Sequence, residues 1–494
     1  MRRILLTAAV LSLLAVPATA PVATAASPPA VPSDLTSVEV SFRGAGGLAM
    51  HGTIITKPTE TDRTNDKTTD EPAAGAGLTG GTAGAGRPGV VLVHGAGTGT
   101  PRTKLLGEAV EFARRGMAVL IYDKRSTGYS LVHRSYPQLA DDALGAVATL
   151  RSQPGVDPAK VGIWGLSEGG WVAPIAASRS KDIAFVVLVG ANGLPPLRQQ
   201  TWAVAAGLRK AGVTGSLIDR AELNLYRTIA DGGMFPEPYY DPAPTLAVVR
   251  QPVLAIWGTH DLLTPPQESP PVFSRALGEG GNRYYTARFF PDADHAAHLT
   301  PDGGVTRLPE LAPGYADLVG SWVGEVTAGR PPATNSSGPA PVQASLTVPV
   351  DPPAWWESAP AQLVALALFL VAFVSYPVAA LVRRLRGRSR APVTRAVWLL
   401  SAGGLVSVIG SFCYLVYLMM TGGKLAAPGP VLLGRPLVWL ALQAVAVVSV
   451  VATVRLAVAW RRTRDSVGGG QLGLLLAGGA VFVPWALYWG LLLP

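Results

Sequence analysis

A serine flanked by glycines stands where a buried strand is expected to meet a helix. The segment Gly-Leu-Ser-Glu-Gly at residues 165–169 follows the strand-like stretch 160–164 and opens a helical stretch, 169–178. A nucleophile on a sharp strand-to-helix turn needs neighbours without side chains, so that the turn can close and the hydroxyl can stand clear. The positive N-terminal end of the helix would then lie beneath the serine. The spacing therefore predicts Ser167 as the nucleophile of a serine hydrolase.

A serine nucleophile also needs a base and an acid, and both residue types follow predicted strands further along the chain. Asp261 comes after the strand-like segment 252–257, and His295 comes after 284–290. Because the strand ends of an open parallel sheet lie at one edge, Ser167, Asp261 and His295 can meet there. His295 would take the serine proton, and Asp261 would fix the imidazole tautomer. The alternatives that remain open are His298 as the base, and Asp292 or Asp294 as the acid.

The oxyanion that develops during attack needs backbone N–H donors beside the serine. One candidate is the N–H of Glu168, and the turn His-Gly-Ala-Gly at 94–97 supplies the other, with Ala96 preferred over Gly97. The Glu168 carboxylate is expected to complement the helix dipole. The chain has no His-Glu-x-x-His motif, and its one cysteine, Cys413, lies in an apolar stretch. The sequence therefore predicts neither a metal site nor a cofactor.

The elements around these residues alternate between strand-like and helix-like segments. After two opening strands near 37–42 and 48–56, short β-branched runs are each followed by a helical stretch. This alternation is typical of an α/β fold, with a mostly parallel sheet covered by helices on both faces. It breaks between residues 194 and 250, where helical stretches with Pro and Gly are expected to form a small cap over the site.

Several motifs together resemble those of bacterial α/β-hydrolases of the dienelactone hydrolase and prolyl oligopeptidase-like group. They are Gly95 with its neighbours, Asp-Lys-Arg at 123–125 with the following 126–130, the turn 165–170, Gly-Thr-His-Asp at 258–261, and Asp294 with His295. The resemblance covers residues 35–325 and implies an α/β-hydrolase fold with a triad of Ser167, Asp261 and His295. In such proteins a glycine usually follows Asp-Lys-Arg, whereas this chain has Ser126. Asp123 and Arg125 are expected to be scaffold residues.

The sequence also predicts an exported protein that is anchored in a membrane. Arg2 and Arg3 precede a short apolar core and small residues, which is typical of a signal peptide at residues 1–26. An uncut anchor is the alternative, although the core is shorter than the roughly 20 residues of a membrane span. The expected organisation begins with a hydrolase domain at 35–328, which contains a disordered loop at 57–88 and a cap at 194–250. A Pro-rich linker at 329–353 then leads to an all-α domain of four transmembrane helices within 361–493.

The net charge of +9 comes from the membrane flanks. From Ala354 onward the chain has 12 Lys/Arg and two acidic residues, whereas the rest of the mature chain has 27 Lys/Arg and 30 Asp/Glu. This distribution does not favour nucleic acid as a partner. Six arginines lie between the first two apolar stretches, and the positive-inside rule puts that loop in the cytoplasm. We therefore expect a multi-pass cell-membrane protein with an extracytoplasmic hydrolase domain.

The leading hypothesis for the function is hydrolysis of a carboxylic ester, or of an amide, through an acyl-enzyme at Ser167. The substrate would be a small-molecule or lipid ester. A serine peptidase is the first alternative, but peptide-cutting prolyl oligopeptidase relatives usually carry a propeller domain, and the segment before Pro88 is too short for one. The second alternative is a transport or binding module with an inactive hydrolase fold. The three acidic residues after Val350 lie outside the apolar stretches, so no carboxylate relay is expected within them.

Overall fold

The structure is a computed structural model that describes residues 30–58, 86–387, 395–421, 427–463 and 469–494. The predicted signal peptide at 1–26 and most of the loop predicted at 57–88 lie outside these ranges. Parts of the two arginine-rich loops between the apolar helices lie outside them as well.

A nine-stranded sheet forms the centre of the hydrolase domain, in the order β1-β2-β4-β3-β5-β6-β7-β8-β9. The first two pairings, β1 with β2 and β2 with β4, are antiparallel, and the others are parallel. This arrangement confirms the α/β class predicted from the alternation of elements. The strands are β1 (Thr36–Arg43), β2 (Ala49–Thr56), β3 (Arg87–Val93), β4 (Ala118–Tyr122), β5 (Val156–Leu166), β6 (Val186–Val189), β7 (Val253–Gly258), β8 (Tyr285–Phe290) and β9 (Asn335–Ser337).

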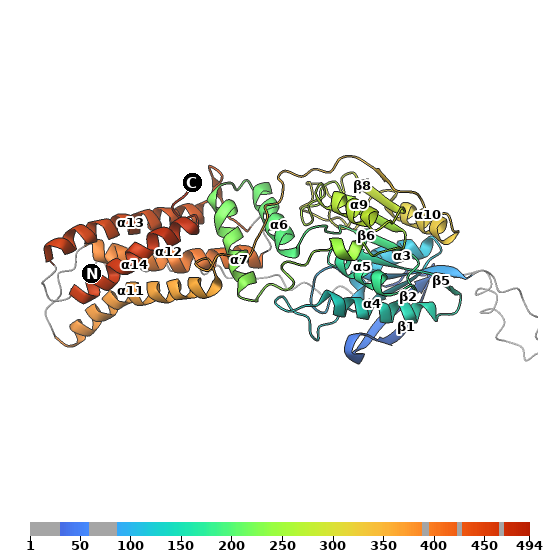
Figure 1. Cartoon of the computed structure of the whole chain (residues 1–494), viewed down its shortest axis with the longest axis horizontal. Helices are drawn as coiled ribbons and strands as arrows, with labels where there is room; N and C mark the ends of the chain where they lie inside the picture. The colour runs from blue at the N-terminus through green and yellow to red at the C-terminus, as the bar shows by residue number, and fades with distance from the viewer. Residues whose placement is uncertain (1–29, 59–85, 388–394, 422–426, 464–468) are drawn as a thin grey trace, which may run out of the picture.

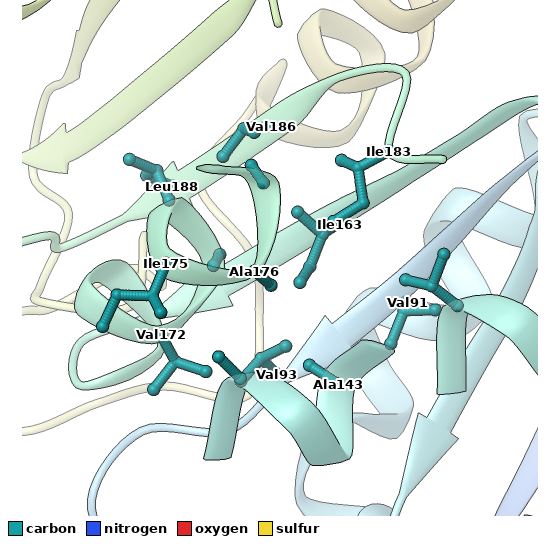
Figure 2. Close-up of a cluster of buried hydrophobic side chains, with 14 of the residues drawn as sticks. Val91, Val93, Ala143, Ile163, Val172, Ile175, Ala176, Ile183, Val186 and Leu188 are labelled. Atoms are coloured by element: carbon teal, nitrogen blue, oxygen red, sulfur yellow. The ribbon is translucent and has the colours of Figure 1, made fainter. Parts of the chain in front are cut away.

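Helices cover both faces of the sheet, which explains why the central strands are apolar along their whole length. One face packs on α4, α5, α8 and α9, and the other packs on α3 and α10. Figure 2 shows part of the first core, where Val172 and Ile175 of α5 meet Ile163 of β5 and Val186 of β6. The helices are α3 (Leu106–Arg114), α4 (Tyr136–Arg151), α5 (Gly169–Arg179), α8 (Ala243–Leu246), α9 (Ser269–Glu279) and α10 (Tyr315–Thr327), with 3-10 helices at Ala45–Gly47 and Arg102–Leu105.

The segment predicted as a cap lies between the hydrolase domain and the C-terminal helices (Figure 1). It contains α6 (Pro196–Lys210), a π-helix (Leu217–Glu222) and α7 (Leu223–Asp231), followed by α8. The apolar side chains of α6, the π-helix and α7 belong to the same buried core as those of the C-terminal helices. The two domains are therefore packed together through the cap.

Four C-terminal helices are long and apolar enough to cross a membrane, as predicted. They are α11 (Ala359–Leu385), α12 (Arg395–Met420), α13 (Leu437–Thr463) and α14 (Gly469–Tyr488), and a two-stranded hairpin of β10 (Val431–Leu432) and β11 (Arg435–Pro436) precedes α13. Close approach depends on glycine, because a β-carbon on Gly404 would lie 2.5 Å from the Phe373 ring of α11. The helices form a bundle in which α11 and α13 each contact both α12 and α14.

Residues 329–353 connect the two domains, but they do not extend freely as their composition suggests. Residues 335–337 pair with β8 as the last strand of the sheet. Further on, the Trp202 indole donates to the carbonyl of Ser345, and the N–H of Thr347 donates to Glu268, both at 2.8 Å. Strand addition at an edge needs backbone groups rather than an apolar period, which is why the sequence pattern gave no sign of it.

Candidate active site

The turn that carries Ser167 joins the end of β5 to the start of α5. Ser167 has a φ of 56°, in the left-handed region that L-residues rarely adopt. A β-carbon on Gly169 would lie 2.7 Å from the carbonyl oxygen of Val93, and one on Gly165 would collide with the Gly169 carbonyl. The two glycines are therefore required for the turn to close, as the sequence predicts, and the N–H of Ser167 is anchored at 2.9 Å on the Val189 carbonyl.

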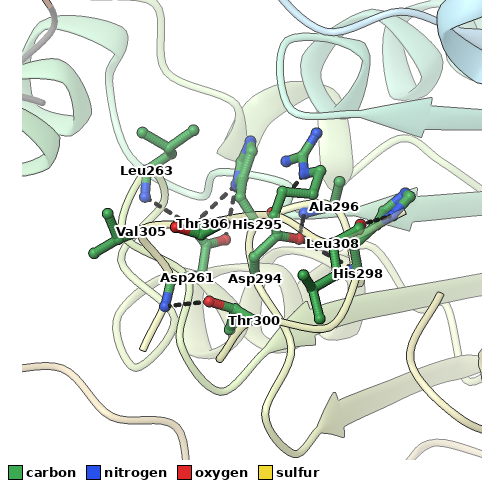
Figure 3. A network of polar contacts seen from close by, with 12 residues as sticks. Asp261, Leu263, Asp294, His295, Ala296, His298, Thr300, Val305, Thr306 and Leu308 are labelled. Atoms are coloured by element: carbon green, nitrogen blue, oxygen red, sulfur yellow. Dashed lines mark hydrogen bonds and ion pairs between the residues drawn. The ribbon is translucent and has the colours of Figure 1, made fainter. Parts of the chain in front are cut away.

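Asp261 and His295 lie together at the same edge of the sheet. Asp261 follows β7 and is fully buried, and its two carboxylate oxygens lie 3.0 and 2.9 Å from Nδ1 of His295. One of these oxygens also accepts from the N–H groups of Leu263 and Thr264, each at 2.8 Å. Nε2 of His295 is buried and has no hydrogen-bond partner within the described ranges. The imidazole is thus oriented by a fixed carboxylate and keeps a free nitrogen (Figure 3).

The alternative acids and base have other contacts. The carboxylate of Asp294 accepts from the N–H of Ala296 at 2.9 Å and pairs with Arg307 at 2.5 Å. His298 lies 3.3 Å from Glu108, and Asp292 is exposed. Figure 3 shows the Asp294 contacts beside the Asp261 contacts. Of the three candidate acids, Asp261 is the one that contacts the His295 imidazole.

Residues 107–307, which include Ser167, Asp261 and His295, match the sequence profile of the prolyl oligopeptidase family. They form a prolyl oligopeptidase family domain. This confirms the resemblance inferred from the motifs and assigns the domain to a serine hydrolase family, in a chain that continues into four apolar helices.

Individual relatives match shorter stretches. The chain is 38% identical over 86 residues to the polyketide transferase claH of Penicillium crustosum, covering 17% of this chain and 28% of that protein. It is 32% identical over 110 residues to the thiohydrolase aneE of Aspergillus aculeatus, covering 21% and 33%. The chain thus spans about a third of the length of the curated relatives it matches. The structure of 2,6-dihydroxy-pseudo-oxynicotine hydrolase aligns over 61% of this chain and 71% of that one, with a TM-score of 0.40 and 14% identity.

The turn after β3, which precedes the matched residues 107–307, lies against Ser167. A β-carbon on Gly95 would lie 3.2 Å from Cβ of Ser167. The N–H of Gly97 donates to the Tyr129 hydroxyl at 3.2 Å, whereas the N–H groups of Ala96 and Glu168 have no acceptor among the described residues. Ala96 therefore suits an oxyanion donor better than Gly97 does. His94, in the same turn, bonds the Tyr122 carbonyl at 2.8 Å, and burial lowers its pKa to about 4.

The carboxylate of Glu168 lies in a buried network that the sequence did not reveal. It accepts hydrogen bonds from Lys124, from Arg134 at 2.7 Å and from the Tyr129 hydroxyl at 2.9 Å. Burial raises the pKa of Glu168, but the charges of Lys124 and Arg134 outweigh it and hold the pKa below its usual value. Two basic side chains thus face one carboxylate beside Ser167, and burial lowers the pKa of Lys124. The helix-dipole role predicted for Glu168 is thus secondary to its ion pairs.

The Asp-Lys-Arg motif supplies part of this network. Arg125 makes a buried two-point contact with Asp142, at 2.6 and 2.8 Å, and Asp123 pairs with Arg102 at 2.9 Å. These contacts fit the scaffold roles predicted for Asp123 and Arg125. The middle residue, Lys124, reaches the carbonyl of Gly95 at 2.6 Å as well as Glu168, so it links the turn at 94–97 to the turn that carries Ser167. The position of Lys124 between two expected scaffold residues was the one feature of the sequence that could have indicated its part in the network.

Within the described residues no cluster of three metal-ligating side chains occurs.

Proposed function

We propose that this protein is a membrane-anchored serine hydrolase that cleaves carboxylic esters through an acyl-enzyme. The observation that carries this proposal is the Asp261–His295 pair, whose free Nε2 lies at the sheet edge that also holds the Ser167 turn. The residues that match the family, 107–307, include Ser167, Asp261 and His295. In structures without substrate, catalytic hydrogen bonds are often long, so the serine–histidine contact is expected to close on binding.

In the first half of the reaction, Oγ of Ser167 attacks the acyl carbon while Nε2 of His295 takes its proton. The Asp261 carboxylate stabilises the imidazolium, and the N–H groups of Ala96 and Glu168 donate to the oxyanion. The acyl–oxygen bond then breaks, and His295 returns the proton to the departing alcohol. In the second half, water attacks the acyl carbon, His295 takes one of its protons, and that proton returns to Oγ of Ser167 as the carboxylic acid leaves.

Peptide hydrolysis is the second candidate, because the family profile is named for an oligopeptidase. The same residues would act on an amide, but an amine is a poorer leaving group than an alcohol and depends more on protonation by His295. Esters are therefore proposed as the preferred substrates.

The protein is also proposed to hold its hydrolase domain outside the cytoplasm. Digestion by a protease added to intact cells tests this location, since a cytoplasmic domain would be cut only after lysis.

The decisive experiment uses the full-length protein in detergent and a fluorophosphonate probe. Wild-type protein should be labelled and should hydrolyse p-nitrophenyl acyl esters faster than aminoacyl p-nitroanilides, and Ser167→Ala should lose labelling and both activities. Full activity in Ser167→Ala would contradict the nucleophile assignment. Faster cleavage of the anilides would favour the peptidase instead. Ser178→Ala, which changes a serine at the far end of α5, is the matched control and should behave as wild type.

A further inference from the structure

A cavity of about 780 Å³ lies where the cap meets the apolar bundle. This volume falls within the roughly 300–1,000 Å³ of typical ligand sites. Its walls come from α7 of the cap, from the ends of α11, α12 and α14, and from the loop that follows β4. In Figure 1 this is the region where α7 meets the ends of the long helices. The cavity therefore joins elements of both domains.

The lining of the cavity is suited to hydrocarbon. Leu225 and Ile229 of α7 face the cavity from the cap, and Leu366, Leu415 and Val416 face it from the bundle. Polar groups in the wall are partly satisfied by one another, because the side-chain oxygen of Gln362 accepts from the indoles of Trp485 and Trp489 at 3.1 and 3.0 Å. A wall of this kind binds apolar chains and gives water few partners.

The side of the cavity that belongs to the bundle is continuous with lipid-facing surface. Leu363 of α11 and Phe412 and Met420 of α12 line the cavity and are also exposed. These residues lie on helices that are apolar and long enough to span a bilayer. An acyl chain in the outer half of the membrane would thus meet apolar side chains from the bilayer into the cavity.

On its other side, the cavity wall includes Arg134, which contacts the residue that follows the candidate nucleophile. This side chain lines the cavity, and its guanidinium donates at 2.7 Å to the carboxylate of Glu168, the residue after Ser167. Nε of Arg134 is buried and has no hydrogen-bond partner within the described residues. Leu131 and Val132 of the same loop are exposed apolar residues in the cavity wall. The cavity therefore lies between exposed apolar side chains of the bundle helices and the loop whose Arg134 contacts Glu168.

We propose that this cavity holds the acyl chain of a membrane lipid ester, so that the substrates are long-chain esters which enter from the bilayer. This inference rests on the proposed serine hydrolase activity. It assigns the bundle a part in substrate binding beyond anchoring. It also accounts for the shared core of the cap and the bundle, since a fixed junction keeps the chain-binding walls in register with the site.

The first test fills the cavity from either side and compares two substrates. Full-length Val416→Trp and Ile229→Trp are measured against p-nitrophenyl palmitate and p-nitrophenyl acetate in detergent micelles. Lost chain binding should lower kcat/KM for the palmitate by about 10-fold or more and leave the acetate rate unchanged. Val406→Trp changes an exposed valine of α12 outside the cavity and should leave both rates unchanged. An unchanged palmitate rate, or an equal fall for both esters in a protein with the wild-type melting temperature, would overturn the proposal.

The second test reads binding without catalysis. Ser167→Ala protein in lipid nanodiscs is irradiated with a diazirine-bearing palmitate ester, and the labelled peptides are mapped by mass spectrometry. Label should appear on α7 and on the Ser411–Met420 end of α12, and it should disappear in the double variant with Val416→Trp. Label confined to the lipid-facing sides of the helices would refute the chain site. Because this readout does not need Ser167, it stays informative if the proposed nucleophile is wrong.

Discussion

Gly190 packs directly against the His295 imidazole. A β-carbon at this position would lie 2.7 Å from both Nδ1 and Cε1 of the ring, and the φ of Gly190 is +54°. The preceding residue, Val189, accepts the hydrogen bond from the N–H of Ser167. The short turn at 189–190 therefore touches both Ser167 and His295, the candidate nucleophile and the candidate base.

We expect Gly190→Ala to impair catalysis strongly. The methyl group would collide with the backbone carbonyl of His295 as well as with its ring, so it must displace His295 or distort the turn, and a misplacement of about 1 Å costs on the order of 100-fold in rate. The measurement is kcat/KM for a p-nitrophenyl ester, with the melting temperature recorded for each variant. Gly107→Ala, at a helical position with open space around it, is the matched control and should keep full activity. Wild-type kcat/KM in Gly190→Ala would show that His295 is not the base.

Asp261→Asn should abolish most activity without unfolding the domain. An asparagine still fills the buried site but does not hold the imidazole in the required tautomer or stabilise its cation, and such a change lowers kcat by about 10⁴-fold in comparable triads. Asp292→Asn removes an exposed carboxylate near the same edge and should behave as wild type. If Asp294→Asn rather than Asp261→Asn caused the larger loss of kcat, the acid would have been assigned to the wrong residue.

Replacing Glu168 with Gln should destabilise the hydrolase domain. The change leaves the buried Lys124 and the partly buried Arg134 without a counter-charge, and breaking a buried pair such as Lys124–Glu168 costs about 3–5 kcal/mol. Because the pKa of Glu168 lies below its usual value near 4.5, its contribution is present above that pH and is lost as the pH falls through the folded-state pKa. Thermal unfolding between pH 3 and pH 8 should show the gap between wild type and variant narrowing only in acid.

The matched control for this charge change is Glu325→Gln. Glu325 pairs with Arg330 at 3.0 Å, but both side chains are largely exposed, so its loss should leave the melting temperature unchanged. Equal melting temperatures for Glu168→Gln and the wild type at neutral pH would mean that the Glu168 network does not stabilise the turn that carries Ser167.

Glu222 has the opposite pH dependence. It is buried in the π-helix of the cap, and one carboxylate oxygen has no hydrogen-bond partner within the described ranges. Burial raises the pKa of this carboxyl well above its usual 4.5, so the folded state favours the neutral acid and the protein loses stability as the pH rises above that value. Glu222→Gln should melt at a higher temperature than wild type at pH 8 and at the same temperature at pH 4. Asp219→Asn, exposed on the same π-helix, should leave the wild-type pH profile intact.

The sequence by itself determined the local features of this protein. The turn that carries Ser167 could be predicted because its requirements are local: a buried strand, a helix and glycines at positions that exclude a β-carbon. The order of Ser167, Asp261 and His295 at strand ends, the α/β class and the four apolar helices followed from periodicity and length for the same reason. Such patterns depend on residues that are close together in the sequence.

Tertiary structure decided what depends on distant partners. Asp261 could be told apart from Asp294 as the partner of His295 only in the folded chain, where β7 brings Asp261 to the imidazole and Asp294 pairs with Arg307. The ion pair of Glu168 with Arg134 likewise comes from a loop more than thirty residues away in the chain. The cap was expected above the site, but its apolar faces could have been buried by any partner. Only the packing showed that they meet the bundle. Hydrophobic burial has no direction, so the sequence indicates that a face is covered, while the fold alone determines by what.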